Sequence, residues 1–278
     1  MSSSTKVKSS LLLLTQTFSH IRNNIKPILE ETFRHTNHNL YIYINPKLNN
    51  HLNSSSSSNF ELSNSGNKEQ LSDRYQIKIL LNQFYQSSFK INPKINVTCL
   101  LHNYHPYSCK RDTKHDFNYD LVITDLLVPN EAIDEYLKLN LPNFKKSIEK
   151  IPFRTIDYKL SNESSVKFED AVSDRDQIFG NKVYMNSILG GTFDRLHIGH
   201  KIMLSEAALL TQNRLLAGVT SECLLVRKKL TELIEDIDAR CQNVKNFLYM
   251  VAPNLDVLTV PISDPFGPSI TERDYQVC

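Results

Sequence analysis

The eleven residues Gly190–His200 read GGTFDRLHIGH, and they decide how the last third of the chain folds. A mostly apolar run, Val183–Leu189, precedes them, as expected for a strand buried in a parallel sheet. The run that follows, His200–Thr211, carries apolar residues at helical spacing. The stretch therefore predicts a strand that turns directly into a helix.

The same alternation continues after this helix. Leu215–Val219 and Leu255–Ile262 are short apolar runs typical of strands. Asp236–Val251 is predicted as a helix that ends before Pro253. Its apolar stripe comprises Ile237, Cys241, Val244, Leu248 and Val251. This order predicts an α/β, Rossmann-like part: one half of a doubly wound parallel sheet, incomplete as it stands.

A second α/β region precedes this part. Its expected strands are Leu40–Ile44, Ile95–Leu101 and Tyr119–Asp125, and its expected helices are Tyr75–Phe84 and Asn130–Leu139. Asn130 is the expected N-cap of the last helix. Asn and Ser dominate residues 49–67, which have too little apolar surface to offset the entropy of ordering. We therefore predict a disordered insert there.

These elements divide the chain into four parts. They are an N-terminal segment with a first helix (1–36), the α/β region with its insert (37–144), a polar linker (145–181) and the partial sheet (182–278). Met1–Ile25 holds Lys6, Lys8 and Arg22 and no acidic residue. A frayed polar terminus and a mitochondrial presequence both fit this composition, so both stay open.

Composition excludes several classes of protein. With 32 Lys and Arg against 30 Asp and Glu, the chain is too near neutral for a generic nucleic-acid binder. No run approaches the roughly 18–20 apolar residues of a membrane span, and Leu11–Leu14 is too short for a secretory signal. Five scattered cysteines indicate reduced thiols, so we expect a cytoplasmic protein, with mitochondria as the alternative. The cysteines are Cys99, Cys109, Cys223, Cys241 and Cys278.

The residues of GGTFDRLHIGH favour phosphate binding. Amides at a helix start and the positive end of the helix dipole attract anions. Gly190 and Gly191 let the backbone approach a ligand closely, and Gly199 leaves room where a polyphosphate would lie. His197 and His200 are three residues apart, so they share one face of the first helical turn and can donate hydrogen bonds to phosphate oxygens.

Other interpretations stay open for the histidines. His197 and His200 could bind zinc, although no further ligand is spaced convincingly nearby, or they could be a purely structural pair. The segment after Ile95–Leu101 offers another candidate metal cluster, made of His102, His105, Cys109 and His115. Neither a GxGxxG nor a GxxxxGK[ST] motif occurs in the chain.

GGTFDRLHIGH resembles the signature of the HxGH nucleotidyltransferase superfamily. The longer string, through Lys201 and on to Ile262–Thr271 (ISDPFGPSIT), resembles the phosphopantetheine adenylyltransferase domain of eukaryotic CoA synthases. This resemblance covers Val183–Thr271. More weakly, Asn39–Ile44 and Tyr119–Leu126 resemble the region that precedes that domain in the same proteins.

The resemblance implies transfer of the adenylyl group of ATP to 4′-phosphopantetheine, which yields dephospho-CoA and pyrophosphate. Mg²⁺ is then expected with ATP, without a tightly bound cofactor or a protein metal site. His200 matches the transition-state histidine, His197 the first motif histidine, and Lys228 a mobile-loop lysine, with Lys229 as its alternate. The implied binding residues are Gly190, Gly191, Thr192, Phe193, Gly199, Lys229 and Asp264, of which Thr192 lies near the reacting phosphates and Asp264 near the pantetheine arm.

Several of these positions have plainer interpretations. Arg227–Lys229 could be a solvated basic run, and Asp264-Pro265 could be turn chemistry. Asp194 is expected to brace the loop through backbone hydrogen bonds. Arg240, placed opposite the apolar stripe of its helix, is expected to be structural or solvated.

The sequence also departs from the family. A VSEET-type strand and an ISSTxxR segment, which grips the ATP phosphates, are not visible before Cys278, so we expect an incomplete domain and an open adenine pocket. A catalytically inactive protein that acts by binding or regulation is therefore the alternative function. Because the kinase motif of CoA synthases is missing, a dephospho-CoA kinase is expected as a separate protein.

Overall fold

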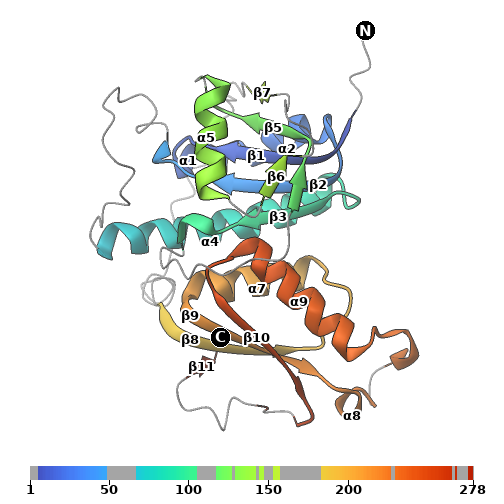
Figure 1. Cartoon of the computed structure of the whole chain (residues 1–278). Coiled ribbons are helices and arrows are strands. Elements are labelled where there is room, and N and C mark those ends of the chain that lie inside the picture. Colours follow the sequence, from blue (N-terminus) through green and yellow to red (C-terminus); the bar gives the residue numbers. More distant parts are fainter. Residues whose placement is uncertain are drawn as a thin grey trace. The chain divides into compact units, whose positions relative to one another are not determined.

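The computed structural model describes residues 6–48, 67–104, 117–126, 129–141, 144–146, 153–156, 183–226, 229–264, 267 and 275–277. They fall into two compact units (Figure 1). The N-terminal unit is drawn from residues 1–100 and 117–182, and the C-terminal unit from residues 101–116 and 183–278. The expected insert lies outside the described residues, except for Asn67, which begins a helix.

The N-terminal unit is built on a five-stranded sheet in which all neighbouring strands are parallel. Its strands are β1 (Val7–Leu14), β2 (Thr36–Ile44), β3 (Asn96–Leu100), β5 (Leu121–Thr124) and β7 (Phe153–Thr155). Their spatial order is β3-β2-β1-β5-β7. Counted along the chain within this sheet, the order is 3-2-1-4-5, that of a doubly wound fold whose winding reverses between β1 and β5. The α/β expectation for this region is confirmed.

Strand β1 corrects the expectation of a frayed polar terminus. From residue 9 to residue 14 the strand is buried, and Leu11–Leu14 are fully buried between β2 and β5. A central parallel strand is covered on both faces, which is why four consecutive leucines fit there without alternation. Strand β1 therefore lies in one sheet with the strands of the α/β region. Within the expected linker, Phe153–Thr155 pairs with β5 as the edge strand β7.

The helices of this unit alternate with its strands along the chain. They are α1 (Phe18–Asn23), α2 (Ile25–Phe33), α4 (Asn67–Ile91) and α5 (Asn130–Asn140), and a separate parallel pair joins β4 (Phe117–Tyr119) to β6 (Phe144–Lys146). Ile25, Ile28, Leu29 and Phe33 give α2 a buried stripe. Pro129 is the N-cap of α5, so the predicted cap at Asn130 is wrong by one residue.

A carboxylate accepts several hydrogen bonds at the point where the N-terminal sheet reverses its winding. Asp125 follows β5, and its two oxygens accept hydrogen bonds from the Thr15 amide at 2.9 and 3.1 Å. The Thr15 hydroxyl donates to the same side chain at 2.8 Å, and the Gln16 amide at 3.2 Å. Asp125 thus ties the end of β5 to the loop that follows β1.

The C-terminal unit contains a second parallel sheet, in the order β10-β9-β8-β11. Its strands are β8 (Tyr184–Gly191), β9 (Thr211–Thr220), β10 (Asp256–Ile262) and β11 (Gln276–Val277). The helices between them are α7 (Ile198–Leu210), α8 (Glu222–Leu225), the 3-10 turn η2 (Thr231–Leu233) and α9 (Ile237–Val251). The strand-helix-strand-helix-strand prediction is confirmed here.

Strand β11 adds to that prediction. Gln276 and Val277 pair with Ser187 and Ile188 on the side of β8 away from β9. Counted along the chain within the sheet, the order is 3-2-1-4, which is the start of a doubly wound sheet across its reversal point. Gln276 and Val277, near the chain's last position, therefore belong to the sheet.

A short segment from the middle of the sequence also belongs to this unit. Leu101 and the turn η1 (His102–Tyr104) follow β3 directly. The Leu101 amide donates to the Val251 carbonyl at 2.8 Å, and His102 Nε2 lies 3.0 Å from the Met250 carbonyl oxygen. Both carbonyls lie at the C-terminal end of α9, where helices leave backbone acceptors without intrahelical partners.

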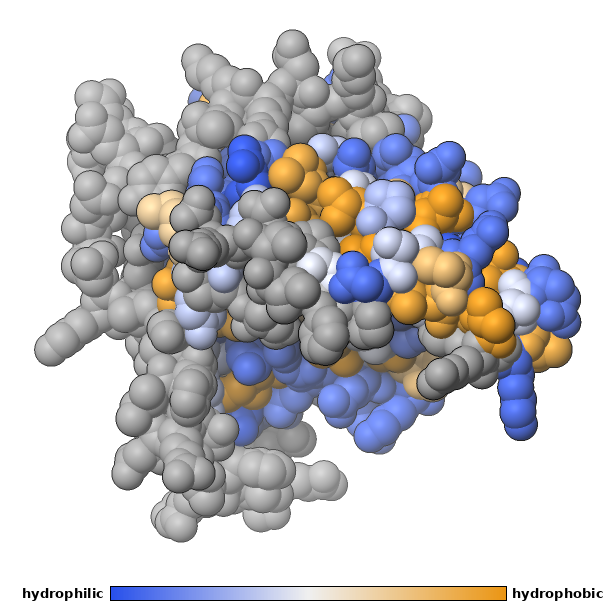
Figure 2. All heavy atoms as spheres, turned by 90° about the horizontal axis from the view of Figure 1, so that it is seen from below, coloured by the Kyte–Doolittle hydropathy of each residue, from blue (hydrophilic) through white to orange (hydrophobic). Residues whose placement is uncertain are grey.

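Apolar side chains also reach the surface of the C-terminal unit. Seen from below, hydrophobic residues lie in small groups between hydrophilic ones (Figure 2). Those with more than a third of their surface exposed are Met185, Met203, Val226, Leu230, Leu233 and Leu258. Among the described residues, no helix combines the length and apolar composition that a bilayer span requires.

Candidate functional site

The loop between β8 and α7 adopts an unusual backbone conformation. Phe193 has a φ of 53° and Arg195 a φ of 41°, both in the left-handed region that non-glycine residues seldom occupy. Phe193 is fully buried. A Cβ on Gly191 would lie 3.1 Å from the Phe193 ring, so the missing side chain of Gly191 makes room for this ring. The expectation that Gly191 also lets the backbone approach a ligand closely stays a prediction.

Gly190 has no such packing reason to be glycine. It is exposed, and a Cβ built there would meet nothing closer than 3.8 Å, an ordinary van der Waals distance. The fold tolerates a side chain at this position. The expectation that Gly190 serves close approach of a ligand therefore stays a prediction, and internal packing does not compete with it.

His197 and His200 come together as their spacing predicts. The two rings stack with centroids 3.8 Å apart and planes 23° apart, and the Phe193 ring lies 5.3 Å from that of His200. His197 is exposed and His200 is half-buried. The His197 ring therefore faces solvent, and the His200 ring contacts the buried ring of Phe193.

His197 is also the N-cap of helix α7. Its Nδ1 accepts a hydrogen bond from the Gly199 amide at 3.1 Å. Because Nδ1 acts as the acceptor, the neutral ring carries its proton on Nε2 and presents it as a donor. A Cβ on Gly199 would lie 3.1 Å from His197 Cε1, so the missing side chain of Gly199 makes room for the His197 ring. The expectation that Gly199 also leaves room for a polyphosphate stays a prediction.

Asp194 braces the loop, as predicted. Its Oδ1 accepts a hydrogen bond from the Glu235 amide at 3.0 Å, and its Oδ2 lies 3.1 Å from Arg195 Nη1. Glu235 Oε2 in turn accepts from the Arg195 amide at 3.3 Å, and the Leu233 carbonyl accepts from Arg195 Nη2 at 2.7 Å. The loop after β8 is thus held against the segment that leads into α9.

Arg240 contributes to this arrangement in a way that the sequence did not reveal. It is structural, as one of its two interpretations held, but it is buried rather than solvated, with 1% of its surface exposed. Arg240 lies three residues after Ile237 and four before Val244, and so belongs to the inward face of α9 and not, as we expected, to the face opposite the apolar stripe. That spacing is the signal that could have identified it. Its guanidinium donates to backbone carbonyls at the ends of β8 and β9.

The ends of β9 and β10 are joined beside this loop. The Ser221 amide and hydroxyl both donate to the Ile262 carbonyl, at 2.9 and 2.7 Å. Asp264 Oδ1 accepts from the Gly267 amide at 2.7 Å, and Gly267 has a φ of 52°. Turn chemistry, which was one interpretation of Asp264, is therefore present. Lys229 is exposed, and Lys228 lies outside the described residues.

The geometry does not favour the metal alternatives. The lone pairs of imidazole lie in the ring plane, and two nearly parallel rings 3.8 Å apart cannot both direct one at a single ion. Of the second candidate cluster, His102 contacts the Met250 carbonyl, while His105, Cys109 and His115 lie outside the described residues. Within the described part of the chain, no three His, Cys, Asp or Glu side chains gather to hold a metal. Cys99, Cys223 and Cys241 carry thiols, not disulfides.

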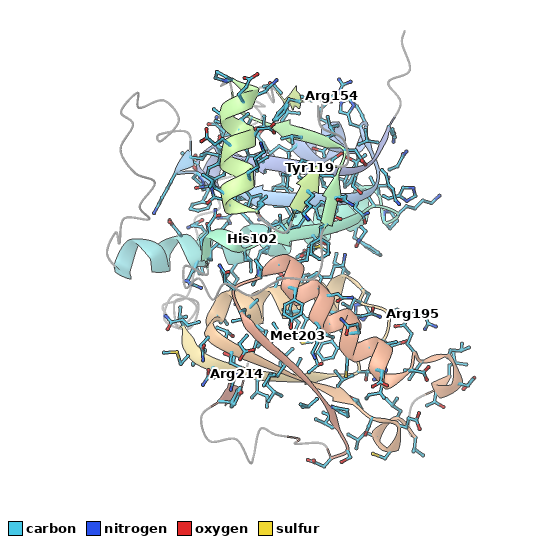
Figure 3. All side chains as sticks on the ribbon, viewed as in Figure 1. His102, Tyr119, Arg154, Arg195, Met203 and Arg214 are labelled. Carbon is cyan, nitrogen blue, oxygen red and sulfur yellow. The ribbon has the colours of Figure 1, made fainter. Side chains whose placement is uncertain are left out.

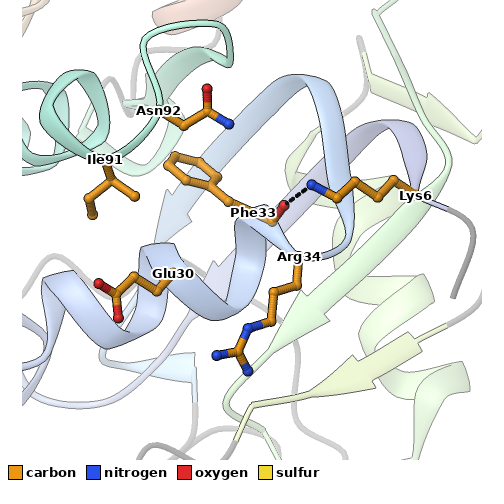
Figure 4. A pocket seen from close by; sticks show the side chains of 6 residues that line it. All are labelled: Lys6, Glu30, Phe33, Arg34, Ile91 and Asn92. Carbon is orange, nitrogen blue, oxygen red and sulfur yellow. Dashed lines mark hydrogen bonds between the residues drawn. The ribbon is translucent and has the colours of Figure 1, made fainter. Parts of the chain in front are cut away.

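Two further features belong to other parts of the chain. Arg214 Nε pairs with Asp256 Oδ2 at 2.7 Å at the amino ends of β9 and β10, and Figure 3 shows Arg195 and Arg214 at opposite ends of the C-terminal unit. An open cavity of about 450 Å³ lies in the N-terminal unit, where Lys6 Nζ donates to the Phe33 carbonyl (Figure 4). Arg34, which also lines this cavity, forms an ion pair with Glu31.

Known proteins match the part of the chain that carries the loop. Residues 188–268 match the Cytidylyltransferase-like family. The chain is 35% identical over 144 residues to a phosphopantetheine adenylyltransferase of Saccharomyces cerevisiae, covering 52% of this chain and 43% of the yeast protein. It is 37% identical over 87 residues to a phosphopantetheine adenylyltransferase of Pyrobaculum aerophilum, covering 31% of this chain and 55% of that protein. No solved structure matches the chain.

The matches differ in how much of each protein they cover. The chain spans about half or less of the length of these relatives. The yeast match is longer than the whole of residues 183–278, so it reaches into the sequence that precedes β8.

Proposed function

We propose that the chain transfers the adenylyl group of ATP to 4′-phosphopantetheine. The match of residues 188–268 to the Cytidylyltransferase-like family supports this proposal. A phosphate oxygen of phosphopantetheine forms a bond to the α-phosphorus of ATP, the bond from that phosphorus to the bridging oxygen breaks, and pyrophosphate leaves. Dephospho-CoA is the product. The stacked pair of His197 and His200 at the carboxyl end of β8 is the observation that carries this proposal.

The loop supplies donors for a triphosphate. Helix α7 is thirteen residues long, and its N-terminus follows the loop directly, so its first amides and its dipole favour bound anions. His197 adds an Nε2 proton, because its Nδ1 is engaged by the Gly199 amide. Gly190, exposed and tolerant of a Cβ, leaves its backbone open to a ligand.

His200 is proposed as the residue that stabilises the transition state. Its ring stacks on the His197 ring and contacts the buried Phe193 ring, and these contacts fix its orientation before substrate binds. The attacking phosphate is already an anion, so no strong base is required. Orientation and charge stabilisation then carry the rate, and one such preorganised donor contributes about 3 kcal/mol.

The remaining roles follow the family resemblance. Thr192 lies at the end of β8, where the reacting phosphates are proposed to bind, and Lys228 or Lys229 is proposed to contact both substrates. Asp264 is proposed to lie near the pantetheine arm, in the turn closed by its bond to Gly267. Mg²⁺ is proposed to bind together with ATP, as the family resemblance implies.

The proposal is tested with the full chain, ATP and 4′-phosphopantetheine, by measuring dephospho-CoA and pyrophosphate. We expect turnover by the wild-type chain and a fall in kcat of about 10²–10³-fold for His200→Ala, with little change in thermal stability. Arg214→Gln, which removes a charge at the amino end of the same sheet, is the matched control with unchanged kcat. Calorimetry with ATP alone provides a second measurement. Neither product nor ATP binding, or full activity of His200→Ala, would contradict the proposal.

A further inference from the structure

Arg240 joins three backbone segments of the C-terminal unit through one guanidinium group. Its Nε donates to the Glu235 carbonyl at 2.7 Å, and its Nη1 donates to the carbonyls of Thr192 at 2.9 Å and Thr220 at 2.8 Å. Thr192 follows β8, Thr220 ends β9, and Glu235 precedes α9. These are the segments from which the candidate site is built.

The partners of Arg240 are carbonyls rather than carboxylates. Among the ion pairs of the described residues, none includes Arg240, although the side chain is 1% exposed. Burial of a charge is costly unless hydrogen bonds compensate it, and charge-assisted bonds to carbonyls do so here. The site therefore has a fixed positive charge beneath it that no described carboxylate neutralises by direct contact.

The bond to Thr192 sets the direction of an amide. In a trans peptide unit, the C=O of one residue and the N–H of the next point in opposite directions, and the chain contains no cis peptide among its described bonds. Because the Thr192 carbonyl points at the buried Arg240, the Phe193 N–H points away from it. The same peptide geometry is visible at Thr220, whose following amide, that of Ser221, donates to the Ile262 carbonyl.

The Phe193 amide lies within a loop whose backbone is suited to anions. Phe193 and Arg195 both have positive φ values, and turns containing left-handed residues turn successive N–H groups into a concavity that binds anions. The amide cannot be rotated inward while Arg240 holds the carbonyl on the other side of the same peptide plane. Arg240 thereby keeps a donor available at the carboxyl end of β8.

We propose that Arg240 is a positioning residue for nucleotide binding, which aims the Phe193 amide at the ATP phosphates by fixing the Thr192 carbonyl. This inference rests on the proposed function and adds a determinant of ATP affinity that does not touch ATP itself. The planar fork of arginine is required, because its hydrogen bonds leave in different directions. A lysine keeps the charge but offers a single head that cannot reach all three carbonyls with the same geometry.

Arg240→Lys and Arg240→Ala in the full chain test this inference. We expect kcat/KM for ATP to fall about 10²-fold in both variants, with a raised KM for ATP and a KM for 4′-phosphopantetheine within about twofold of wild type. A merely structural role would lower the amount of active protein, and hence kcat, and leave both KM values unchanged. Arg214→Ala, which removes an exposed arginine at the far end of the sheet, is the matched control and keeps both KM values.

Chemical rescue separates the fork from the charge. Guanidinium ion at millimolar concentration should restore part of the ATP affinity of Arg240→Ala, measured by calorimetry, whereas methylammonium at equal ionic strength should not. An unchanged KM for ATP in a folded Arg240→Lys, or absence of rescue by guanidinium, overturns the inference. Loss of folded structure in both variants also overturns it, because Arg240 is then structural. If the wild-type chain itself binds no ATP, the proposed function fails first.

Discussion

Gly199→Ala is the substitution whose effects on activity and stability the structure separates most clearly. The new Cβ would lie 3.1 Å from His197 Cε1 and 3.2 Å from Nδ1, where carbon atoms prefer about 3.5–4.0 Å. The ring must therefore move by roughly half an ångström. Because a displacement of about 1 Å costs on the order of 10²-fold in rate, we expect kcat/KM for ATP to fall about tenfold.

Stability should change little in the same variant. Alanine in place of glycine stabilises a helix by up to about 1 kcal/mol. Weakening the bond between the Gly199 amide and His197 Nδ1 removes the N-cap of α7, which costs about 1 kcal/mol. These terms oppose each other, so the free energy of unfolding should stay within about 0.5 kcal/mol of wild type. Denaturant unfolding and steady-state kinetics measure the two effects.

A double-mutant cycle provides the control. His197→Asn keeps a side-chain acceptor at the N-cap and removes the imidazole. In that background, Gly199→Ala meets no ring, so it should stabilise the protein by up to about 1 kcal/mol and cause no further loss of activity. If Gly199→Ala lowers kcat/KM equally with and without His197, the contact with the ring is not the cause and the reasoning is refuted.

Three other substitutions are informative. Gly190→Ala should leave thermal stability unchanged, since its Cβ meets nothing within 3.8 Å, and should weaken ATP binding in calorimetry; unchanged affinity would remove Gly190 from the site. Asp125→Ala should cost about 3 kcal/mol in chemical denaturation, because it leaves the amides of Thr15 and Gln16 without their acceptor, and a loss under 1 kcal/mol would contradict this. Burial raises the pKa of Tyr119 to about 12, with a smaller contribution from a nearby carboxylate. The unfolded chain then loses this phenolic proton near pH 10 and the folded chain only near pH 12, so stability should fall by about 2–3 kcal/mol over that interval, and Tyr119→Phe should fall less.

The sequence predicts the C-terminal unit well because each element has a local signal. The apolar run before Gly190 and the stripe on α9 place strands and helix to within a few residues. The GGTFDRLHIGH stretch also predicts that His197 and His200 share a face, since helical spacing alone brings residues three apart together. For these features, no long-range contact has to be known.

Other features depend on partners far away in the sequence. Leu11–Leu14 looks like a terminal fragment until β2 and β5 are known to cover it on both sides. Of the three glycines expected to give a ligand room, Gly191 and Gly199 lie against the rings of Phe193 and His197. Neither ring position can be read from a linear motif, because both follow from a backbone that turns through left-handed conformations.

Arg240 shows the same difficulty in a buried polar residue. Its place on the inward face of α9 follows from its spacing in sequence from Ile237 and Val244. A charged residue, however, interrupts the apolar pattern that would identify this face. Only the carbonyls of Thr192 and Thr220, 48 and 20 residues earlier, explain how the charge is accommodated.

The docking of Leu101 and His102 on the end of α9 has a consequence for modularity. The two units are interleaved in the chain, since the C-terminal one borrows a segment from between two strands of the other. Excision at residue 183 would leave the Val251 and Met250 carbonyls without these donors, although the break falls between well-formed elements. A chimaera with a relative must therefore exchange the borrowed segment together with the sheet of the C-terminal unit.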